Sequence, residues 1–239
     1  MNHKNHYIGI NQRIPIQVLD NALMYILRGD LLFQEEVLRD LSEHIGGQNR
    51  IKKALQIVNR IILSTDAAKL VAQHFSFEEY THLPDSDKKA LITALIANAY
   101  PFAYHLMSIM GTVLKVQPFV NAQYINEKMS EKYGSNRATD IANYSLIPMF
   151  LELGFINRKQ VSLYEKCESL PINNQKINEF LIFTEIKNSG SKSFTDNHLS
   201  LNPWFYFFKP KINIPRTLSI LSYTESGYSN NGIYAIAEY

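Results

Sequence analysis

The stretch that decides the fold comprises residues 119–168, FVNAQYINEKMSEKYGSNRATDIANYSLIPMFLELGFINRKQVSLYEKCE. Asn121 can cap a first helix, which Gly134 can end. Asn136 can cap a second helix, which continues into the apolar sequence LELGFI at residues 151–156. A short segment of alternating polar and apolar residues follows and favours a hairpin. The stretch therefore predicts a helix, a glycine turn, a second helix and a hairpin.

The chain before this stretch is expected to be helical. Apolar side chains recur there at three- and four-residue steps, which is typical of amphipathic helices. Tyr100-Pro101 interrupts one such segment. Because proline lacks the backbone donor and disfavours helical geometry in the residue before it, we expect a break or a kink there. Six or seven helices are expected before Pro118.

The chain after residue 168 changes character. Residues 175–187 fit either a helix or a strand, because the apolar run FLIF favours both. Residues 188–202 are rich in serine, glycine and asparagine and are predicted to be a linker. The tail contains an aromatic run and a hairpin expected to pair residues 218–223 with residues 233–237. The predicted domains are residues 1–117, 118–187 and 188–239.

Composition sets limits on the function. The chain has 239 residues, of which 46% are hydrophobic, so it can bury a substantial core. It has no apolar run of about 18 residues and no apolar leader, so we expect a cytoplasmic protein that does not interact with a membrane. The net charge is only +2, so contact with nucleic acid must come from local clusters of basic residues. The single cysteine, Cys167, is interpreted as structurally neutral, and no internal repeat of fixed period is apparent.

The sequence FLELGFINR at residues 150–158 resembles the end of the recognition helix in winged helix-turn-helix DNA-binding proteins. The resemblance covers residues 119–168 and implies a mainly α fold, with an N-terminal helical bundle, a winged helix-turn-helix and a short β-containing tail. It implies base-facing roles for Asn136, Arg137, Thr139 and Asn143, and phosphate or minor-groove roles for Arg158, Lys159 and Lys166. Pro148 lies inside the expected recognition helix and is predicted to kink or split it.

The order of elements over the whole chain resembles the BrxA family of bacterial BREX phage-defence systems. The resemblance rests on a helical front half with the basic sequence NRIKK at residues 49–53, the sequence AYPF at residues 99–102 and a later winged helix. It implies that the front helices and the winged unit together embrace a DNA duplex. Arg50, Lys53 and Arg60 would then contact phosphates.

The function expected from these features is non-enzymatic binding of double-stranded DNA, in phage defence or in regulation. The alternative is a protein interaction module that uses the winged unit and the aromatic tail, with a homodimer as one form. A remote alternative comes from Glu185-x-Lys187, which resembles part of the metal site of restriction-type nucleases. Such a site needs a second carboxylate, and no aspartate lies between Asp140 and Asp196. No histidine pair has zinc-binding spacing, so we expect no catalytic residue, metal or cofactor.

Overall fold

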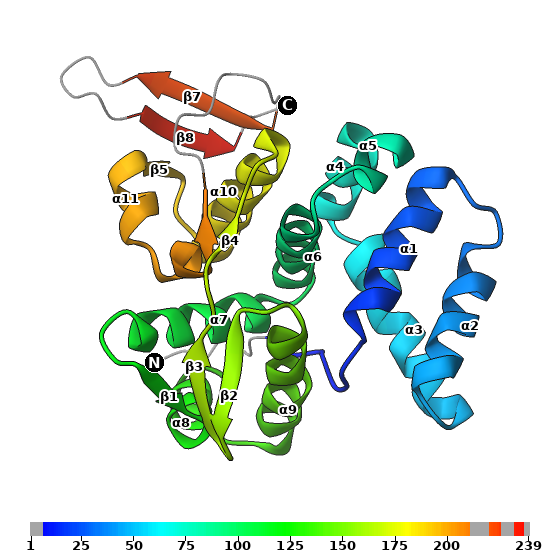
Figure 1. The fold of residues 1–239 in the computed structure, drawn as a ribbon, viewed down its shortest axis with the longest axis horizontal. Helices are drawn as coiled ribbons and strands as arrows, with labels where there is room; N and C mark the ends of the chain where they lie inside the picture. Colours follow the sequence, from blue (N-terminus) through cyan, green and yellow to red (C-terminus); the bar gives the residue numbers. More distant parts are fainter. Residues whose placement is uncertain (1–6, 211–219, 226–231, 237–239) are drawn as a thin grey trace.

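The computed structural model describes residues 7–210, 220–225 and 232–236, and these residues form a mainly helical protein with a few short strands. In Figure 1 the first five helices lie on the right, and α6 and α7 lie in the middle. A helix, strand and hairpin unit lies at the lower left, and the C-terminal elements lie at the upper left. The expected fold class, mainly α with a β-containing C-terminal region, is confirmed.

Seven helices precede Pro118 in the described chain, as the apolar periodicity predicts. They are α1 (Ile16–Arg28), α2 (Phe33–His44), α3 (Gln48–Ile62), α4 (Asp66–His74), α5 (Phe77–Thr81), α6 (Asp85–Ala99) and α7 (Pro101–Leu114). The helix α6 is buried on every side from Ala90 to Ala99, because α3, α7 and α10 (Gln175–Ser189) pack around it. It is therefore the central element of the core.

The expected break at Tyr100-Pro101 is confirmed. Tyr100 is extended, with φ −134° and ψ 91°, and Pro101 is the first residue of α7, where its missing N–H costs nothing. The chain bends by 118° between the axes of α6 and α7. Within the described residues, no single helix has the length and apolar composition to cross a membrane, and only this bent pair meets that test together.

The stretch at residues 119–168 contains its elements in the predicted order. They are β1 (Phe119–Asn121), α8 (Ala122–Tyr133), α9 (Arg137–Glu152), β2 (Ile156–Gln160) and β3 (Leu163–Lys166). The strands form an antiparallel sheet in the order β1-β3-β2. The expected caps at Asn121 and Asn136 both form, since each side chain accepts backbone N–H groups of the helix that follows. We call this segment the β1–β3 unit.

Pro148 does not split α9, which differs from the expectation. The helix continues through it to Glu152. Residues 145–147, 149 and 150 are buried on both sides of the proline, so tertiary packing compensates for the single lost backbone hydrogen bond.

Glu152, at the end of α9, joins the β1–β3 unit to the front helices. Its Oε1 accepts the backbone N–H of Ile16 at 2.8 Å, and its Oε2 accepts a hydrogen bond from Arg13 Nη2 at 2.8 Å. Pro15, which precedes α1, has no side-chain donor or acceptor, so the carboxylate of Glu152 takes the place of a cap for α1. The contact therefore fixes how the two regions are oriented.

The C-terminal region differs from the sequence prediction in one respect. Residues 175–187, whose sequence fits either a helix or a strand, belong to the helix α10. Gly190 ends this helix in the left-handed conformation, with φ 73°. The predicted linker at residues 188–202 instead contains β5 (Ser193–Thr195) and α11 (Asp196–Leu201). The linker prediction was wrong because Phe194 and Leu199 are buried and β5 pairs with the distant β8 (Gly232–Ile236).

The remaining elements complete the C-terminal region. They are β4 (Leu170–Pro171), the 3-10 helix η1 (Pro203–Phe207), β6 (Phe208–Lys209) and β7 (Leu221–Glu225). The expected hairpin is present as β7 paired antiparallel with β8, and its turn lies outside the described residues. The aromatic run lies in η1, whose Trp204, Phe205 and Phe207 are buried.

Two parts of the chain share one topology. In each, a helix leads to a short strand, the strand runs directly into a second helix, and a later hairpin pairs back onto the strand. The first sheet has the order β1-β3-β2, and the other has the order β5-β8-β7. Val120 faces Tyr164 in the first sheet, and Phe194 faces Tyr234 in the second, and all four are buried. The similarity is topological, since the second part has the short η1 after α11 where the first has the long α9 after α8.

Candidate nucleic-acid interface

The outer side of α9 carries an exposed stripe formed by Arg137, Asp140 and Tyr144, which we call the α9 stripe. These residues recur at three- and four-residue steps and so lie on one side of the helix. The side chain of Tyr144 is 72% exposed. Asn136 lies just before the helix, and its Oδ1 accepts two backbone N–H groups of the first turn at 2.9 and 3.1 Å. Its amide therefore serves first as the helix cap.

Thr139 and Asn143 do not lie on the stripe, and the expectation that they face bases is not met by this geometry. Thr139 is 0% exposed, and its hydroxyl donates a hydrogen bond to the Gly134 carbonyl at 2.7 Å. Asn143 is 1% exposed, and its Nδ2 donates to Asn126 Oδ1 at 2.8 Å. Both side chains fall on the face that buries Leu146, because residues three and four apart on a helix share a side.

The hairpin β2–β3 lies beside α9 and carries exposed basic side chains. Arg158 is exposed, and Lys159 is exposed with its Nζ 3.8 Å from a carboxylate oxygen of Glu165. The tip residue Val161 is 86% exposed. These side chains are open to a partner that also contacts the α9 stripe.

Lys166 is not available on the hairpin in the way the sequence predicts. Its Nζ donates to the Cys167 carbonyl at 2.9 Å and to Ser169 Oγ at 2.6 Å, and it lies 4.9 Å from the ring centre of Tyr206. Burial lowers the pKa of its ammonium group. Lys166 therefore links the base of the hairpin to η1. Because this contact depends on residues far away in the sequence, no local pattern predicts it.

A hollow of about 670 Å³ lies between α8, α9 and the hairpin. Its lining is mostly polar and includes Asn126, Asp140, Tyr144 and Arg158. The β1–β3 unit, residues 119–168, carries six basic and six acidic side chains, so its surface is close to neutral. Attraction to an anionic partner would therefore depend on where the cations lie rather than on net charge.

The front helices hold the other predicted phosphate contacts. Arg50 and Lys53 of α3 are exposed and form no ion pair with any described residue. Arg60 is different, because it is partly buried and its Nε donates to the Ala99 carbonyl at 3.1 Å. Arg60 is therefore less open to a duplex than Arg50 and Lys53, although it lines the same hollow as Lys53.

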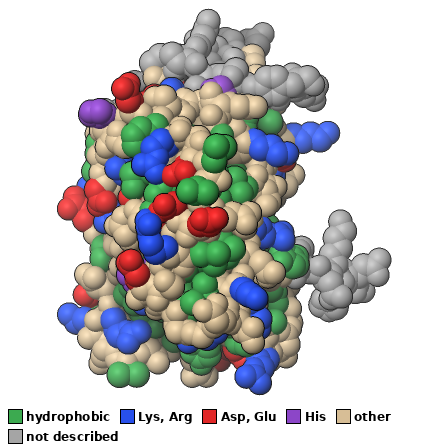
Figure 2. All heavy atoms as spheres, turned by 90° about the vertical axis from the view of Figure 1, so that its right-hand side faces the viewer, with side chains coloured by type: hydrophobic (Ala, Val, Ile, Leu, Met, Phe, Trp, Pro, Cys, Tyr) green, Lys and Arg blue, Asp and Glu red, His purple; other side chains and the backbone are tan. Residues whose placement is uncertain are grey.

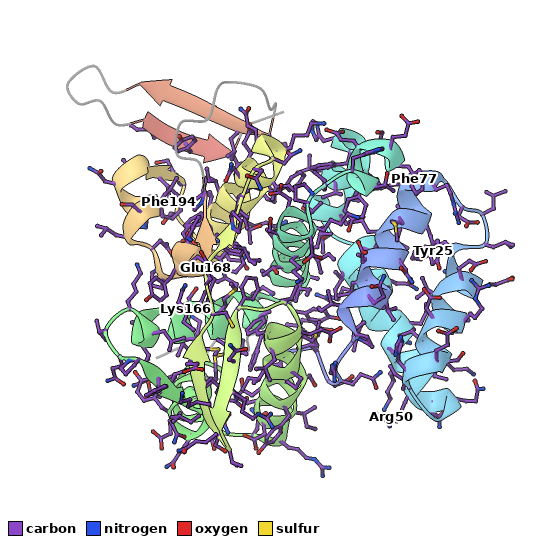
Figure 3. All side chains as sticks on the ribbon, in the orientation of Figure 1. Tyr25, Arg50, Phe77, Lys166, Glu168 and Phe194 are labelled. Carbon is purple, nitrogen blue, oxygen red and sulfur yellow. The ribbon has the colours of Figure 1, made fainter. Side chains whose placement is uncertain are left out.

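Two views show how these groups are distributed. Figure 2 faces the side on which the front helices lie, and basic side chains are scattered over it from top to bottom while acidic ones lie mainly across its middle and left. Figure 3 shows Arg50 at the lower right, at the start of α3, and Lys166 far from it beside β3. The predicted site residues therefore do not form one cluster. Those brought together on the β1–β3 unit are Arg137, Arg158 and Lys159.

Sequence reasoning missed Tyr144 as a residue of the exposed face. It lies seven positions after Arg137, and this spacing places both on the same side of a helix. The helical period could therefore have predicted that Tyr144 lies on the exposed face.

The nuclease-like Glu185 and Lys187 lie on the helix α10 and not on a strand. Glu185 is 0% exposed and accepts hydrogen bonds from Tyr104 Oη at 2.8 Å and Asn202 Nδ2 at 2.6 Å. Burial raises the pKa of this carboxyl group. In the part of the chain that the structure describes, no three His, Cys, Asp or Glu residues are placed to hold a metal ion. We find no family model that matches the chain, and no curated protein or solved structure that is significantly similar to it.

Proposed function

We propose that this protein binds double-stranded DNA through the β1–β3 unit, acting as a winged helix-turn-helix, and catalyses no reaction. The observation that carries the proposal is the exposed α9 stripe beside the exposed Arg158 and Lys159 of the hairpin. In such an arrangement a helix can enter the major groove while the hairpin follows the adjacent backbone. The interaction would take place in the cytoplasm.

The roles of the residues follow from their positions. Arg137 is the exposed side chain at the start of α9 with the donors to contact a guanine edge. Arg158 and Lys159 would contact phosphates, which position a protein on DNA without specifying a sequence. Arg50 and Lys53 on α3 would add two further phosphate contacts to a longer duplex. This wider contact is what the resemblance to BrxA implies, and with it a role in phage defence or regulation.

The test is binding of a fluorescently labelled duplex, followed by anisotropy at low and high salt. With the two phosphate contacts of Arg158 and Lys159, the affinity should fall with a log–log slope of about −1.8, or roughly 12-fold between about 50 and 200 mM salt. Arg137→Ala should weaken discrimination between sequences, and Arg158→Ala should weaken all duplexes alike.

The matched control for both variants is Lys192→Ala, an exposed lysine near β5 and outside the β1–β3 unit. This variant should bind the duplex like the unchanged protein. Absence of binding at low salt, or an affinity that does not depend on salt, would overturn the proposal.

A second candidate function is contact with a protein partner or with a second copy of this chain. It is favoured by the apolar side chains Tyr144 and Val161, which are 72% and 86% exposed on this nearly neutral surface. Exposed aromatic side chains are enriched in protein interfaces. Light scattering in high salt separates the two functions. A complex that persists there and dissociates in Tyr144→Ser would favour the protein contact, and a monomer at all salt concentrations would exclude a homodimer.

A further inference from the structure

A second hollow lies apart from the α9 stripe, where the segment before α1 crosses α3 and the junction of α6 and α7. Its volume is about 560 Å³, which is within the range of small-ligand sites, about 300 to 1,000 Å³. Polar and aromatic side chains dominate its lining, and they come from segments far apart in the sequence. They include Tyr7, Lys53, Asn59, Arg60, Asn98 and Tyr100.

Arg60 is the side chain that gives the hollow its chemistry. Its Cζ lies 4.2 Å from the ring centre of Tyr7 and 5.3 Å from that of Tyr100. The two rings are nearly parallel, with centres 6.5 Å apart and planes inclined by 17°. Because Nε is bonded to the Ala99 carbonyl, the guanidinium is held in place while its two terminal nitrogens have no hydrogen-bond partner among the described residues. A fixed guanidinium with free terminal nitrogens suits bidentate contact with an oxyanion such as phosphate.

The charge of the lining favours the same kind of group. Lys53 adds a second cation, and it is exposed and forms no ion pair with a described residue. Aspartate and glutamate are absent from the described lining of the hollow. A phosphate group would therefore meet two cations without a competing carboxylate.

Asn98, one of the lining residues, carries a buried acceptor whose orientation is fixed. Thr184 donates its hydroxyl to the Phe180 carbonyl at 2.7 Å, so its oxygen must accept the hydrogen bond from Asn98 Nδ2 at 2.8 Å. Nδ2 also donates to the Ala94 carbonyl at 2.8 Å. Asn98 Oδ1 is thereby set as an acceptor, and it has no partner among the described residues although the side chain is only 9% exposed.

The neighbouring Asn59 Oδ1 is likewise buried without a partner in the described chain. Unpaired buried acceptors are uncommon in native proteins, because each lacks the hydrogen bond that it would form in water. Both oxygens are closed off from the hollow as well, so they do not contact a ligand that lies in it. The open part of the lining therefore combines two cations with the exposed ring of Tyr7.

We propose that this hollow binds a free nucleotide. The phosphate would be held by Arg60 and Lys53, and the base would pack against the ring of Tyr7, which is 55% exposed, whereas Tyr100 is buried behind it. A nucleotide combines an oxyanion and a flat ring in one small molecule, and these are the groups that the open part of the lining complements. The proposal is independent of DNA binding by the β1–β3 unit.

The test is isothermal titration calorimetry on the full chain with AMP and GMP as probes. Adenosine and inorganic phosphate serve as partial ligands, and each should bind about tenfold or more weakly than the better nucleotide, because each forms only part of the contacts. Arg60→Gln should weaken nucleotide binding by about tenfold or more, because it removes charged hydrogen bonds to the phosphate. Circular dichroism verifies that this variant is folded.

Lys53→Ala keeps the test decisive if Arg60→Gln is unfolded, because Lys53 is exposed and its loss leaves the core intact. It should weaken binding severalfold, whereas Lys52→Ala should not. Lys52 is the matched control, since it is an exposed lysine next in the sequence that does not line the hollow.

Three results would overturn the proposal. One is the absence of heat with either nucleotide, and another is equal weakening by Lys52→Ala and Lys53→Ala. The third is duplex binding that requires Arg60 without any binding of mononucleotides, which would assign the hollow to a DNA phosphate. Arg137→Ala should leave nucleotide affinity unchanged, so failure of the DNA proposal and failure of this one are distinguishable.

Discussion

Gly111 lies in the interior of α7 at the point where η1 approaches most closely. A Cβ atom at this position would lie less than 3.0 Å from the Pro203 carbonyl oxygen, 3.1 Å from its carbonyl carbon and 3.3 Å from Phe207 Cε2. Gly111→Ala must therefore move η1 away from α7, since the nearest obstacle is backbone and cannot rotate aside. Overpacking of this kind costs about 1 to 3 kcal/mol.

The substitution also has a favourable effect that must be subtracted. Alanine stabilises a helix interior by about 1 kcal/mol relative to glycine. The clash should exceed this gain, because relief requires a shift of a segment that is anchored by three buried aromatic residues. We expect Gly111→Ala to lower the free energy of unfolding by up to about 2 kcal/mol.

The assay is urea unfolding followed by tryptophan fluorescence, since Trp204 is the only tryptophan and lies next to Pro203. It is fully buried, with its ring centre 5.3 Å from that of Tyr104. Displacement of η1 should shift its native emission to longer wavelength. Gly46→Ala is the control, because a Cβ there meets nothing within 4 Å and the backbone is not left-handed. If Gly111→Ala raised stability with unchanged emission, the close approach of η1 would be refuted.

Three further outcomes are expected. Burial raises the pKa of Glu185, so its folded-state contribution to stability is present at low pH and is lost as pH rises through that raised pKa. As pH rises, the free energy of unfolding of Glu185→Gln should therefore increase relative to that of the unchanged protein, which urea titrations at several pH values would measure. Glu185→Ala should lower the free energy of unfolding by about 1 to 3 kcal/mol for each donor left unpaired. Glu152→Ala should lower the free energy of unfolding by about 0.5 to 2 kcal/mol, because the first turn of α1 loses the carboxylate that accepts its N–H group. An unchanged thermal midpoint of unfolding would contradict this. If Arg50 and Lys53 of α3 add their contacts to those of Arg158 and Lys159 on a long duplex, the salt slope should be about −3.6. Replacing Arg50 and Lys53 by alanine should return it to about −1.8.

The sequence by itself determined most of the helices before residue 168 and the breaks between them, whereas it left residues 175–187 open between helix and strand. Apolar periodicity, the caps Asn121 and Asn136, and Pro101 act within a few residues, so they predict helix positions without knowledge of the fold. The order of helix, turn, helix and hairpin at residues 119–168 depends on such local effects and agrees with the structure. Of the candidate site, the pattern at the helix start indicated the exposed Arg137, and the resemblance to winged helix-turn-helix proteins added Arg158 and Lys159.

Only the tertiary structure decided which side chains remain available. Lys166 is held by Ser169 and Tyr206 in another part of the fold, and β5 forms inside the expected linker because β8, some forty residues later, pairs with it. Asn98 and Thr184 are 86 positions apart in the sequence, yet their hydrogen bond orients the amide of a residue that lines the hollow around Arg60. Local energetics set the secondary structure. The hydrogen-bond partners of buried polar groups depend on which distant segments pack together, and a short sequence pattern does not predict that packing.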